Sequence, residues 1–288
     1  MSEIHHFFNT QNSSPLKKLD FDLLKAKSID LWVKRDDLLH PEVSGNKWRK
    51  LKYNLIEAEK TGHNTLLTFG GAFSNHIAAV AAAGELFNFK TIGLIRGEKQ
   101  GELNPTLQFA TEKGMQLHYL SRSDYRRRND SDFIKSFEKE FGKFYYLPEG
   151  GTNQLAIKGS GEIIDEINQQ LPQPPDYICA PCGTGGTLAG LISKADSKTQ
   201  VLGFSALKGD FLKKEINDLL IHSKIDYSQN WNLNLNYHFG GYAKWNQELI
   251  DFINQLNPKI ILDPIYTGKM FFGTVSYTHL TLPTICSV

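Results

Sequence analysis

The sequence has few cysteines and no long apolar run. Three cysteines in 288 residues are too few for the disulfide framework that stabilises small secreted proteins. The longest apolar run, residues 77–83, is far shorter than the roughly 18 residues that cross a bilayer. The first residues lack the basic stretch and apolar stretch of a secretory signal. We therefore expect a cytoplasmic protein without a membrane partner.

An excess of charge of one sign is also missing. Lysine and arginine number 32 and aspartate and glutamate 31, which gives a net charge of +1. Proteins that bind nucleic acids normally carry a basic stripe. The one basic cluster here, residues 122–128, is interrupted by Asp124 and followed by Asp130. We therefore expect no nucleic-acid partner and a globular chain of one or two domains.

Helical and strand patterns alternate along most of the chain. We expect strands at residues 31–33, 65–69, 91–95, 116–120, 177–180 and 201–205. We expect helices at residues 47–60, 75–87, 105–113, 154–169 and 186–193. This alternation predicts an α/β fold with mostly parallel sheets flanked by helices. Two such runs, on either side of residues 148–151, predict two domains with a ligand-binding cleft between them.

Lys47 is the lysine best suited to chemistry. It follows Gly45 and Asn46 at an expected helix start, and the apolar Leu51 and Leu55 lie on the same helical face. That face points Lys47 inward, where burial lowers the pKa of a lysine and allows it to form a Schiff base. The alternative is that Lys47 belongs to a solvated basic face, as most lysines do.

A second segment, residues 70–76, joins an apolar strand to an alanine-rich helix. Its two glycines allow a tight turn. Ser74 and Asn75 then fall at a helix start, with His76 beside them, where unpaired backbone N–H groups attract a carboxylate. A simple helix cap at Ser74 is an equally good interpretation.

A third segment repeats the strand–loop–helix form, with the sequence Gly183-Thr184-Gly185-Gly186-Thr187. Consecutive N–H groups in such a loop converge on a phosphate, and the threonine hydroxyls assist. The segment lacks the spacing of a dinucleotide site and the Gly-Lys-Ser/Thr ending of a P-loop. It therefore fits a single phosphate monoester.

Two cysteines and two tyrosines complete the candidates. Cys179 and Cys182 form a CxxC pair, which is typical of thiol oxidoreductases. No second pair completes a zinc site, so we expect no metal, and we favour Cys179 in the core and Cys182 in the glycine loop. Tyr242 and Tyr266 stand close to glycines, where a phenol could reach a ligand, although packing is the usual role of tyrosine.

A reactive amine, a carboxylate site and a phosphate loop together indicate pyridoxal phosphate (PLP), an aldehyde cofactor with one phosphate. In this order, from about Leu31 to Lys269, the segments resemble the 1-aminocyclopropane-1-carboxylate (ACC) deaminase and D-cysteine desulfhydrase family. These are fold type II PLP enzymes related to the tryptophan synthase β subunit. The resemblance implies a large PLP-binding domain (1–48 and 157–288) and a small domain (49–156). A homodimer is the default expectation.

The resemblance also implies roles for single residues. Lys47 would bond covalently to the cofactor, and Asn75 would contact its phenolic oxygen. Ser74 would face the substrate carboxylate or the reacting centre, with Asn75 and His76 beside the substrate. The other site residues are Gly183, Thr184, Gly185, Gly186 and Thr187 around the phosphate, and Tyr242 and Tyr266 facing the substrate.

The resemblance leaves two substrates open. A D-cysteine desulfhydrase forms pyruvate, ammonia and hydrogen sulfide, whereas an ACC deaminase opens a cyclopropane ring to give 2-oxobutanoate and ammonia. ACC deaminases carry glutamate after the second tyrosine, where this chain has Thr267, and this favours D-cysteine. A protein that binds a phosphorylated metabolite without turnover, and a thiol oxidoreductase, are further alternatives.

The resemblance ends at Gly273. Residues 274–288 lack the amphipathic pattern of the helix expected there and carry Pro283 in a β-prone run. They look like a foreign reading frame joined to a truncated gene, so we expect a non-native tail and no helix. The loop that offers a hydroxyl to the pyridine nitrogen of the cofactor is then missing. We expect a destabilised, inactive chain, and robust activity would contradict this expectation.

Overall fold

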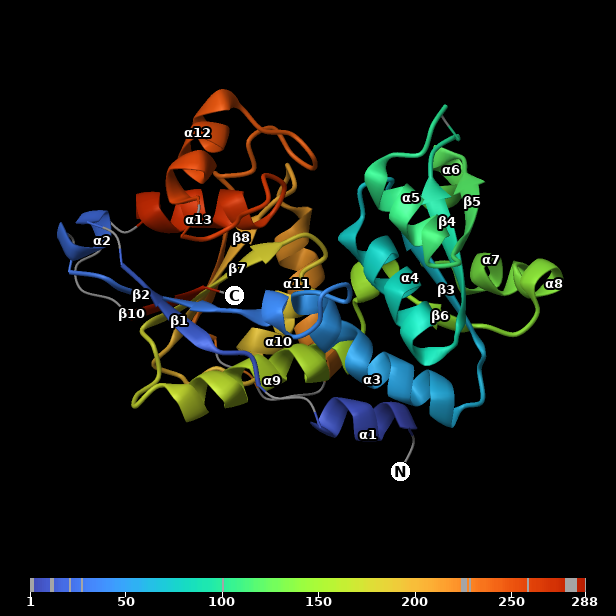
Figure 1. Cartoon of the computed structure of the whole chain (residues 1–288), viewed down its shortest axis with the longest axis horizontal. Coiled ribbons are helices and arrows are strands. Elements are labelled where there is room, and N and C mark those ends of the chain that lie inside the picture. Colours follow the sequence, from blue (N-terminus) through green and yellow to red (C-terminus); the bar gives the residue numbers. More distant parts are fainter. Residues whose placement is uncertain are drawn as a thin grey trace. The chain divides into compact units, whose positions relative to one another are not determined.

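The computed structural model describes residues 3–10, 13–20, 22–26, 28–99, 101–223, 227, 229–257, 259–277 and 284–287. The chain forms two compact units (Figure 1). Unit 1 comprises Met1–Asn12 and Asp37–Gly159, and unit 2 comprises Ser13–Asp36 and Ser160–Val288. The division expected from the sequence differs in its boundaries, which it put after residues 48 and 156, and in the placement of residues 1–12.

The sheet of unit 1 has four parallel strands in the order β5-β4-β3-β6. Their bounds are β3 (Thr65–Gly70), β4 (Lys90–Arg96), β5 (Gln116–Leu120) and β6 (Tyr145–Leu147). In the central strand β3, Leu66, Leu67 and Phe69 are all fully buried. A strand that is covered on both faces needs mostly apolar residues, and this pattern is why the strand could be predicted from the sequence.

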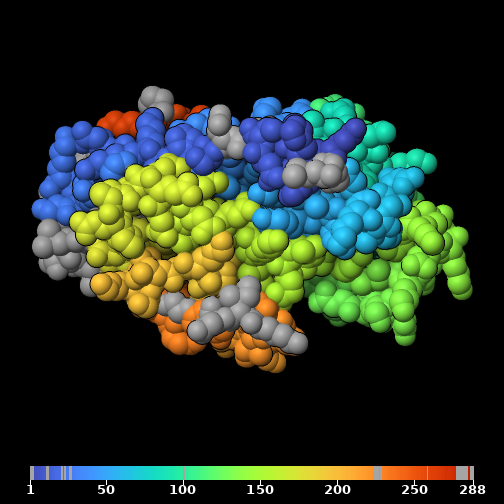
Figure 2. All heavy atoms as spheres, turned by 90° about the horizontal axis from the view of Figure 1, so that it is seen from below, coloured from blue at the N-terminus to red at the C-terminus, as the bar shows by residue number. Residues whose placement is uncertain are grey.

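Helices surround this sheet. They are α1 (Glu3–Thr10), α3 (Asn46–Lys60), α4 (Asn75–Phe87), α5 (Pro105–Glu112), α6 (Arg122–Tyr125), α7 (Ser131–Ser136) and α8 (Glu138–Phe141), with a 3₁₀ turn, η2 (Glu149–Gly151). The small residues of α4 let it pack closely on β3 and β4. Figure 2 shows α1 (dark blue) against α3 (light blue), and Leu51 and Leu55 of α3 are fully buried, as predicted.

The sheet of unit 2 has six strands in the order β1-β2-β10-β7-β8-β9. Their bounds are β1 (Leu16–Leu19), β2 (Asp30–Lys34), β7 (Tyr177–Cys182), β8 (Gln200–Ser205), β9 (Trp231–Asn234) and β10 (Thr284–Ser287). The edge strand β1 pairs antiparallel with β2, and every other pair is parallel. The predicted α/β fold with mostly parallel sheets is confirmed.

The helices of unit 2 cover both faces of this sheet. They are α2 (Asp22–Ala26), α9 (Gln154–Gln170), α10 (Gly186–Ile192), α11 (Phe211–Ser223), α12 (Gln247–Leu256) and α13 (Thr267–Tyr277). A 3₁₀ turn, η1 (Asp36–Leu38), spans the point where the chain passes from unit 2 to unit 1. In Figure 1, α12 and α13 lie on one side of the sheet and α9 and α10 on the other. The helix α9 starts in unit 1 and continues into unit 2, where Glu166 pairs with the buried Lys34 of β2.

The expectation of no helix beyond Gly273 was wrong for residues 274–277. The helix α13 continues to Tyr277, although its sequence is rich in glycine, β-branched and aromatic residues. Tertiary packing overrides this weak propensity, because Met270 and Phe271 are buried in the core and a Cβ on Gly273 would lie 2.6 Å from the Phe204 ring. Residues 278–283 and 288 of the expected tail lie outside the described residues.

The segment 284–287 forms β10 in the middle of the sheet. It pairs in parallel with β2 on one side and β7 on the other, and Ile285 is buried. The side-chain identity of the tail matters little to these backbone hydrogen bonds. That the tail is non-native therefore stays a prediction. Within the described ranges, no helix has the length and apolar character needed to cross a membrane.

Candidate active site

Lys47 lies in the first turn of α3. The N-cap residue Gly45 has φ = 62°, a left-handed conformation that costs other residues strain, and it turns the chain sharply into the helix. Lys47 is partly buried, and its ammonium group is 3.4 Å from the carbonyl oxygen of Gly150. Burial lowers the pKa of Lys47 to about 8 because the charged form loses solvation. More of this amine is therefore neutral near pH 7 than is usual for a lysine.

A second lysine binds the same turn. Lys50, one helical turn after Lys47, is fully buried and donates to the Gly150 oxygen (2.6 Å) and to Thr152 Oγ1 (2.9 Å). The turn that accepts these bonds belongs to η2, where Gly150 and Gly151 have φ = 65° and 69°. The stronger contact of Lys50 with the Gly150 oxygen leaves Lys47 the weaker one at 3.4 Å. Lys50 therefore fixes the turn, whereas Lys47 is held to it less tightly.

His76 is the second residue of α4 and is 1% exposed. Its Nε2 is 2.9 Å from Thr68 Oγ1, and the Thr68 hydroxyl donates to the Leu147 oxygen. Nε2 therefore carries the proton, and Nδ1 presents a lone pair that has no hydrogen-bond partner in the described part of the chain. Burial, followed by the charges of Lys47 and Lys50, holds the pKa of His76 well below its usual value, so the ring is neutral.

Ser74 and Asn75 begin α4. Ser74 is the N-cap, and its Oγ accepts from the N–H of Ile77 at 3.4 Å, so the capping interpretation holds as one role of this residue. Asn75 is exposed at the first helical position. A Cβ on Gly70 would lie 2.4 Å from Ile77 Cγ1 and 3.0 Å from Ser74 Oγ, so glycine is required for this turn. The N–H groups at this helix start suit a carboxylate.

The lowered pKa of Lys47 predicts how its reactivity depends on pH. Below pH 8 the amine is protonated and cannot attack an aldehyde, and above it the neutral form dominates. The rate at which PLP bonds to apoprotein, measured between about pH 6 and pH 10, should therefore rise with a midpoint near 8. Lys60→Ala, at the other end of α3, should leave the profile unchanged. A midpoint near the ordinary lysine value of 10.5 would contradict the prediction.

In unit 2, residues 183–187 connect β7 to α10 as predicted. The N-cap of α10 is Gly185, which has φ = 77° and no side chain to occupy the N–H groups of the first turn. A Cβ on Gly185 would lie 2.5 Å from Ile216 Cγ1, so the loop is packed against α11 with no room for a side chain. The backbone N–H groups at the start of α10, where the helix dipole is positive, suit a phosphate group.

The structure brings Tyr266, one of the two predicted tyrosines, to this loop. A Cβ on Gly183 would lie 3.1 Å from the Tyr266 ring and 3.5 Å from its hydroxyl oxygen. The rings of Tyr242 and Tyr266 meet edge to face, with centroids 6.2 Å apart and an angle of 61° between the planes. Tyr242 is exposed and Tyr266 partly buried. Tyr266 therefore stands beside the glycine loop, and Tyr242 packs against Tyr266.

Two charged residues hold the backbone segments that carry these tyrosines. Asp263 accepts from the N–H groups of Ile265 (2.8 Å), Tyr266 (2.7 Å) and Thr267 (3.0 Å), and so caps the start of α13. Lys269, 1% exposed, donates to the carbonyl oxygens of His238 (2.9 Å) and Gly241 (2.8 Å). Burial lowers the pKa of Lys269 to about 8, although the charge of Asp263 raises it.

The loop that carries Tyr242 has a strained backbone, which the hydrogen bonds of Lys269 restrain. Phe239, Gly240, Gly241 and Ala243 all have positive φ, and two of them are not glycine. This backbone is strained and persists only because other groups fix it. The pair of bonds from Lys269 supplies that restraint, since it binds carbonyls on both sides of Phe239 and Gly240.

The two cysteines are not arranged for redox chemistry. Both lie on β7, with Cys182 as its last residue rather than in the loop, which corrects one expectation. Residues three apart on a strand point to opposite faces, so the thiols cannot approach each other. Burial raises the pKa of Cys179 to about 12, which suppresses its thiolate. The thiol oxidoreductase alternative is therefore unsupported.

Sequence reasoning missed Lys50, the glycine turn of η2, Asp263 and Lys269. The first two contact each other across about 100 residues, and no local pattern reports this. Asp263 did carry a signal, because an aspartate a few residues before a helix start is a common cap. Lys269 is the opposite case: a lysine in a short helix gives no sign that it is buried.

The α/β fold, the partly buried lysine at a helix start and the glycine loop agree with an enzyme that uses PLP. Residues 10–218 match the family model described as pyridoxal-phosphate dependent enzyme, and the chain belongs to that family. The bifunctional D-cysteine desulfhydrase/ACC deaminase of Arabidopsis thaliana is 32% identical over 269 residues, which cover 86% of this chain and 67% of the relative. The predicted ACC deaminase and D-cysteine desulfhydrase family, and PLP as its cofactor, are confirmed.

Further comparisons agree. A putative ACC deaminase of Thermotoga maritima is 33% identical over 280 residues, which cover 90% of this chain and 89% of the relative. The crystal structure of an ACC deaminase homologue matches with a TM-score of 0.84 at 25% identity, over 100% of this chain and 94% of that chain. These matches support the fold type II assignment and leave the substrate to be derived from the site.

Proposed function

We propose that this PLP-dependent enzyme is a D-cysteine desulfhydrase. It would convert D-cysteine, or a similar small amino acid with a leaving group on the β-carbon, to pyruvate, ammonia and sulfide. ACC deaminase activity is the alternative, since relatives carry both names. The position after Tyr266 distinguishes them.

The observation that carries this choice is the bonding of Thr267. Its hydroxyl donates to Asp263 Oδ2 at 2.6 Å and accepts from the Asp263 N–H at 2.9 Å. Thr267 is thus committed to the cap of α13, and it supplies no carboxylate beside Tyr266. Ring opening of ACC is expected to need that carboxylate, whereas loss of a thiolate needs only a base and a phenol.

In unit 1, we assign Lys47 as the residue that bonds to the cofactor and moves the α-proton. A pKa of about 8 supports both tasks, because the amine accepts a proton readily and returns it. Ser74 and the N–H groups of the first turn of α4 would hold the substrate carboxylate, with the exposed Asn75 against the cofactor ring oxygen. His76 would remain neutral beneath them.

In unit 2, we assign residues 183–187 to the phosphate of PLP, which fits a side-chain-free N-cap at Gly185. When bound, PLP supplies a ring that accepts electrons from the α-carbon. Tyr242 and Tyr266 would protonate the departing sulfur, and Asp263 and Lys269 would keep the two phenols in place.

The test is a comparison of kcat/KM for D-cysteine and ACC with the PLP-loaded protein. Because the tail predicts an inactive chain, the comparison is made on the chain as it stands and on one with a family-like C-terminus restored. We expect D-cysteine to be preferred by at least about tenfold, with sulfide and pyruvate formed in equal amounts. Thr267→Ser, which keeps the hydroxyl, should retain this activity, whereas Thr267→Glu should lose it because a carboxylate would face Asp263. A preference for ACC with 2-oxobutanoate as product would refute the proposal.

We also propose that the enzyme is a cytoplasmic homodimer. The small number of cysteines supports the compartment, and the frequency of two-fold homodimers supports the assembly. Light scattering after gel filtration measures the mass directly, and a value near 32.5 kDa, that of one chain, would rule the dimer out.

A further inference from the structure

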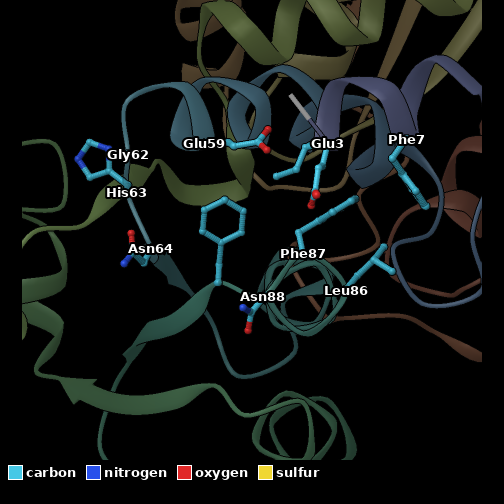
Figure 3. Close-up of a pocket in the computed structure, with 11 residues that line it drawn as sticks. Glu3, Phe7, Glu59, Gly62, His63, Asn64, Leu86, Phe87 and Asn88 are labelled. Atoms are coloured by element: carbon cyan, nitrogen blue, oxygen red, sulfur yellow. The ribbon is translucent and has the colours of Figure 1, made fainter. Parts of the chain in front are cut away.

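Unit 1 contains a pocket of about 570 Å³ that the catalytic residues do not use (Figure 3). It lies where α1 meets the C-terminal ends of α3 and α4, and its lining includes Glu3, Phe7, Glu59, Asn64, Phe87 and Phe89. Lys47 and Asn75 stand at the N-terminal ends of those same helices. Twelve residues of helix separate the two ends in each case, or about 18 Å at 1.5 Å per residue.

The pocket carries two carboxylates. Glu3 comes from α1 and Glu59 from the last turn of α3, and Figure 3 shows both side chains projecting into the same part of the pocket, above Phe87. The Oε2 atom of Glu59 is buried and has no hydrogen-bond partner among the residues that the structure describes. A carboxylate oxygen removed from water without a partner is costly, which indicates that a bound group completes it.

In the described part of the chain, the lysine that follows Glu59 is directed elsewhere. Lys60, the next residue, pairs with Glu57 at 3.6 Å on the outer side of α3. The helices add negative potential, since α3 ends at Lys60 and α4 at Phe87, and the C-terminal end of a helix carries about half a negative charge. The pocket is thus set up for a positive charge by four independent groups.

Aromatic rings form the apolar wall. Phe7 and Phe87 meet edge to face with centroids 5.1 Å apart, and Phe89 also lines the pocket. Ring faces attract cations, and most strongly those with a bulky, weakly hydrated ammonium head. This cavity is too large for a single metal ion. The described residues also contain no group of three or more metal-binding side chains.

We propose that this pocket binds a small organic ammonium cation. The carboxylates of Glu3 and Glu59 neutralise the charged head, and the phenylalanine rings cover the alkyl groups. The proposal is independent of which amino acid the enzyme converts, because the pocket lies at the opposite ends of α3 and α4 from Lys47 and Asn75.

Choline is the probe of choice. Its quaternary nitrogen cannot form an imine with an aldehyde cofactor, so any binding to the PLP-loaded enzyme reports on a non-covalent site. Its neutral counterpart, 3,3-dimethylbutan-1-ol, has the same shape without the charge. Isothermal titration should show one choline per chain and no binding of the alcohol. No heat with choline up to about 10 mM, or equal binding of the alcohol, would overturn the proposal.

Matched variants locate the site. Glu59→Gln should weaken choline binding by at least about tenfold, because it removes the carboxylate that needs the charge. Glu57→Gln, on the same helix but paired with Lys60, should bind choline like the wild type. If Glu59→Gln does not fold, Glu3→Gln at the exposed start of α1 replaces it. Unchanged binding in a folded variant of Glu59 or Glu3 would show that the cation binds elsewhere.

Discussion

Lys47→Ala protein is expected to lose turnover by a factor of at least about 10³. As proposed, this one amine both bonds to the cofactor and carries the α-proton, so its removal eliminates two steps together. The fold should survive, because the hydrogen bond of Lys47 to a described residue is the long one to Gly150 (3.4 Å), while Lys50 keeps the turn in place. Turnover with D-cysteine and thermal unfolding of the same preparations measure both statements.

The lysine that bonds to the cofactor can be identified chemically. Borohydride reduction of PLP-loaded wild-type protein should fix the cofactor on one lysine, and mass spectrometry of the peptides should identify Lys47. Lys60→Ala serves as the control because it removes an exposed lysine of the same helix. Attachment to Lys50, or full activity of Lys47→Ala, would show that another lysine does the chemistry.

Gly159→Ala is expected to destabilise the protein by about 3 kcal/mol. A Cβ at this position of α9 would lie 2.1 Å from the carbonyl oxygen of Arg49 and 3.0 Å from its carbon. Both atoms are backbone of α3, so relief requires a shift of the helix that carries Lys47. We expect a lower midpoint in urea unfolding and weaker PLP binding in the same variant.

Gly161→Ala is the matched control, two residues further along α9. Its Cβ would lie 3.3 Å from the Gly190 oxygen and 3.3 Å from the flexible end of Lys194, which can move. The higher helix propensity of alanine offsets the crowding, so the unfolding free energy should change by less than about 1 kcal/mol. Equal effects of the two substitutions would mean that the contact with α3 is not the cause.

Local signals in the sequence predicted local structure well. The helix at residues 75–87 and the strand at 116–120 have the predicted bounds. In each case the chain marks its own ends, with Ser74 capping α4 and with Gly114 preceding β5 at φ = 80°. The parallel strands were readable because burial on both faces demands an unbroken apolar run.

Elements that depend on distant partners were not predictable. The edge strand β1 has two exposed lysines in its middle and gains its form from pairing with β2. The end of α13 and β10 likewise depend on residues far away in the sequence, Phe204 in the first case and β2 in the second. The candidate site divides in the same way. Its reactive residues have sequence signatures, whereas the residues that fix them, Lys50 and Lys269, act through contacts that only folding creates.

The position of β10 in the sheet determines when unit 2 can complete its folding during synthesis. β10 is the last strand along the chain, but it stands between β2 and β7, which leave the ribosome much earlier. Until residues 284–287 emerge, both earlier strands have open edges that can pair with other copies. The sheet of unit 1 uses only residues 65–147 and needs nothing from that segment. A nascent chain at this stage thus carries the complete sheet of unit 1 joined to a unit 2 with open strand edges, and edge-to-edge association between copies is most favoured then.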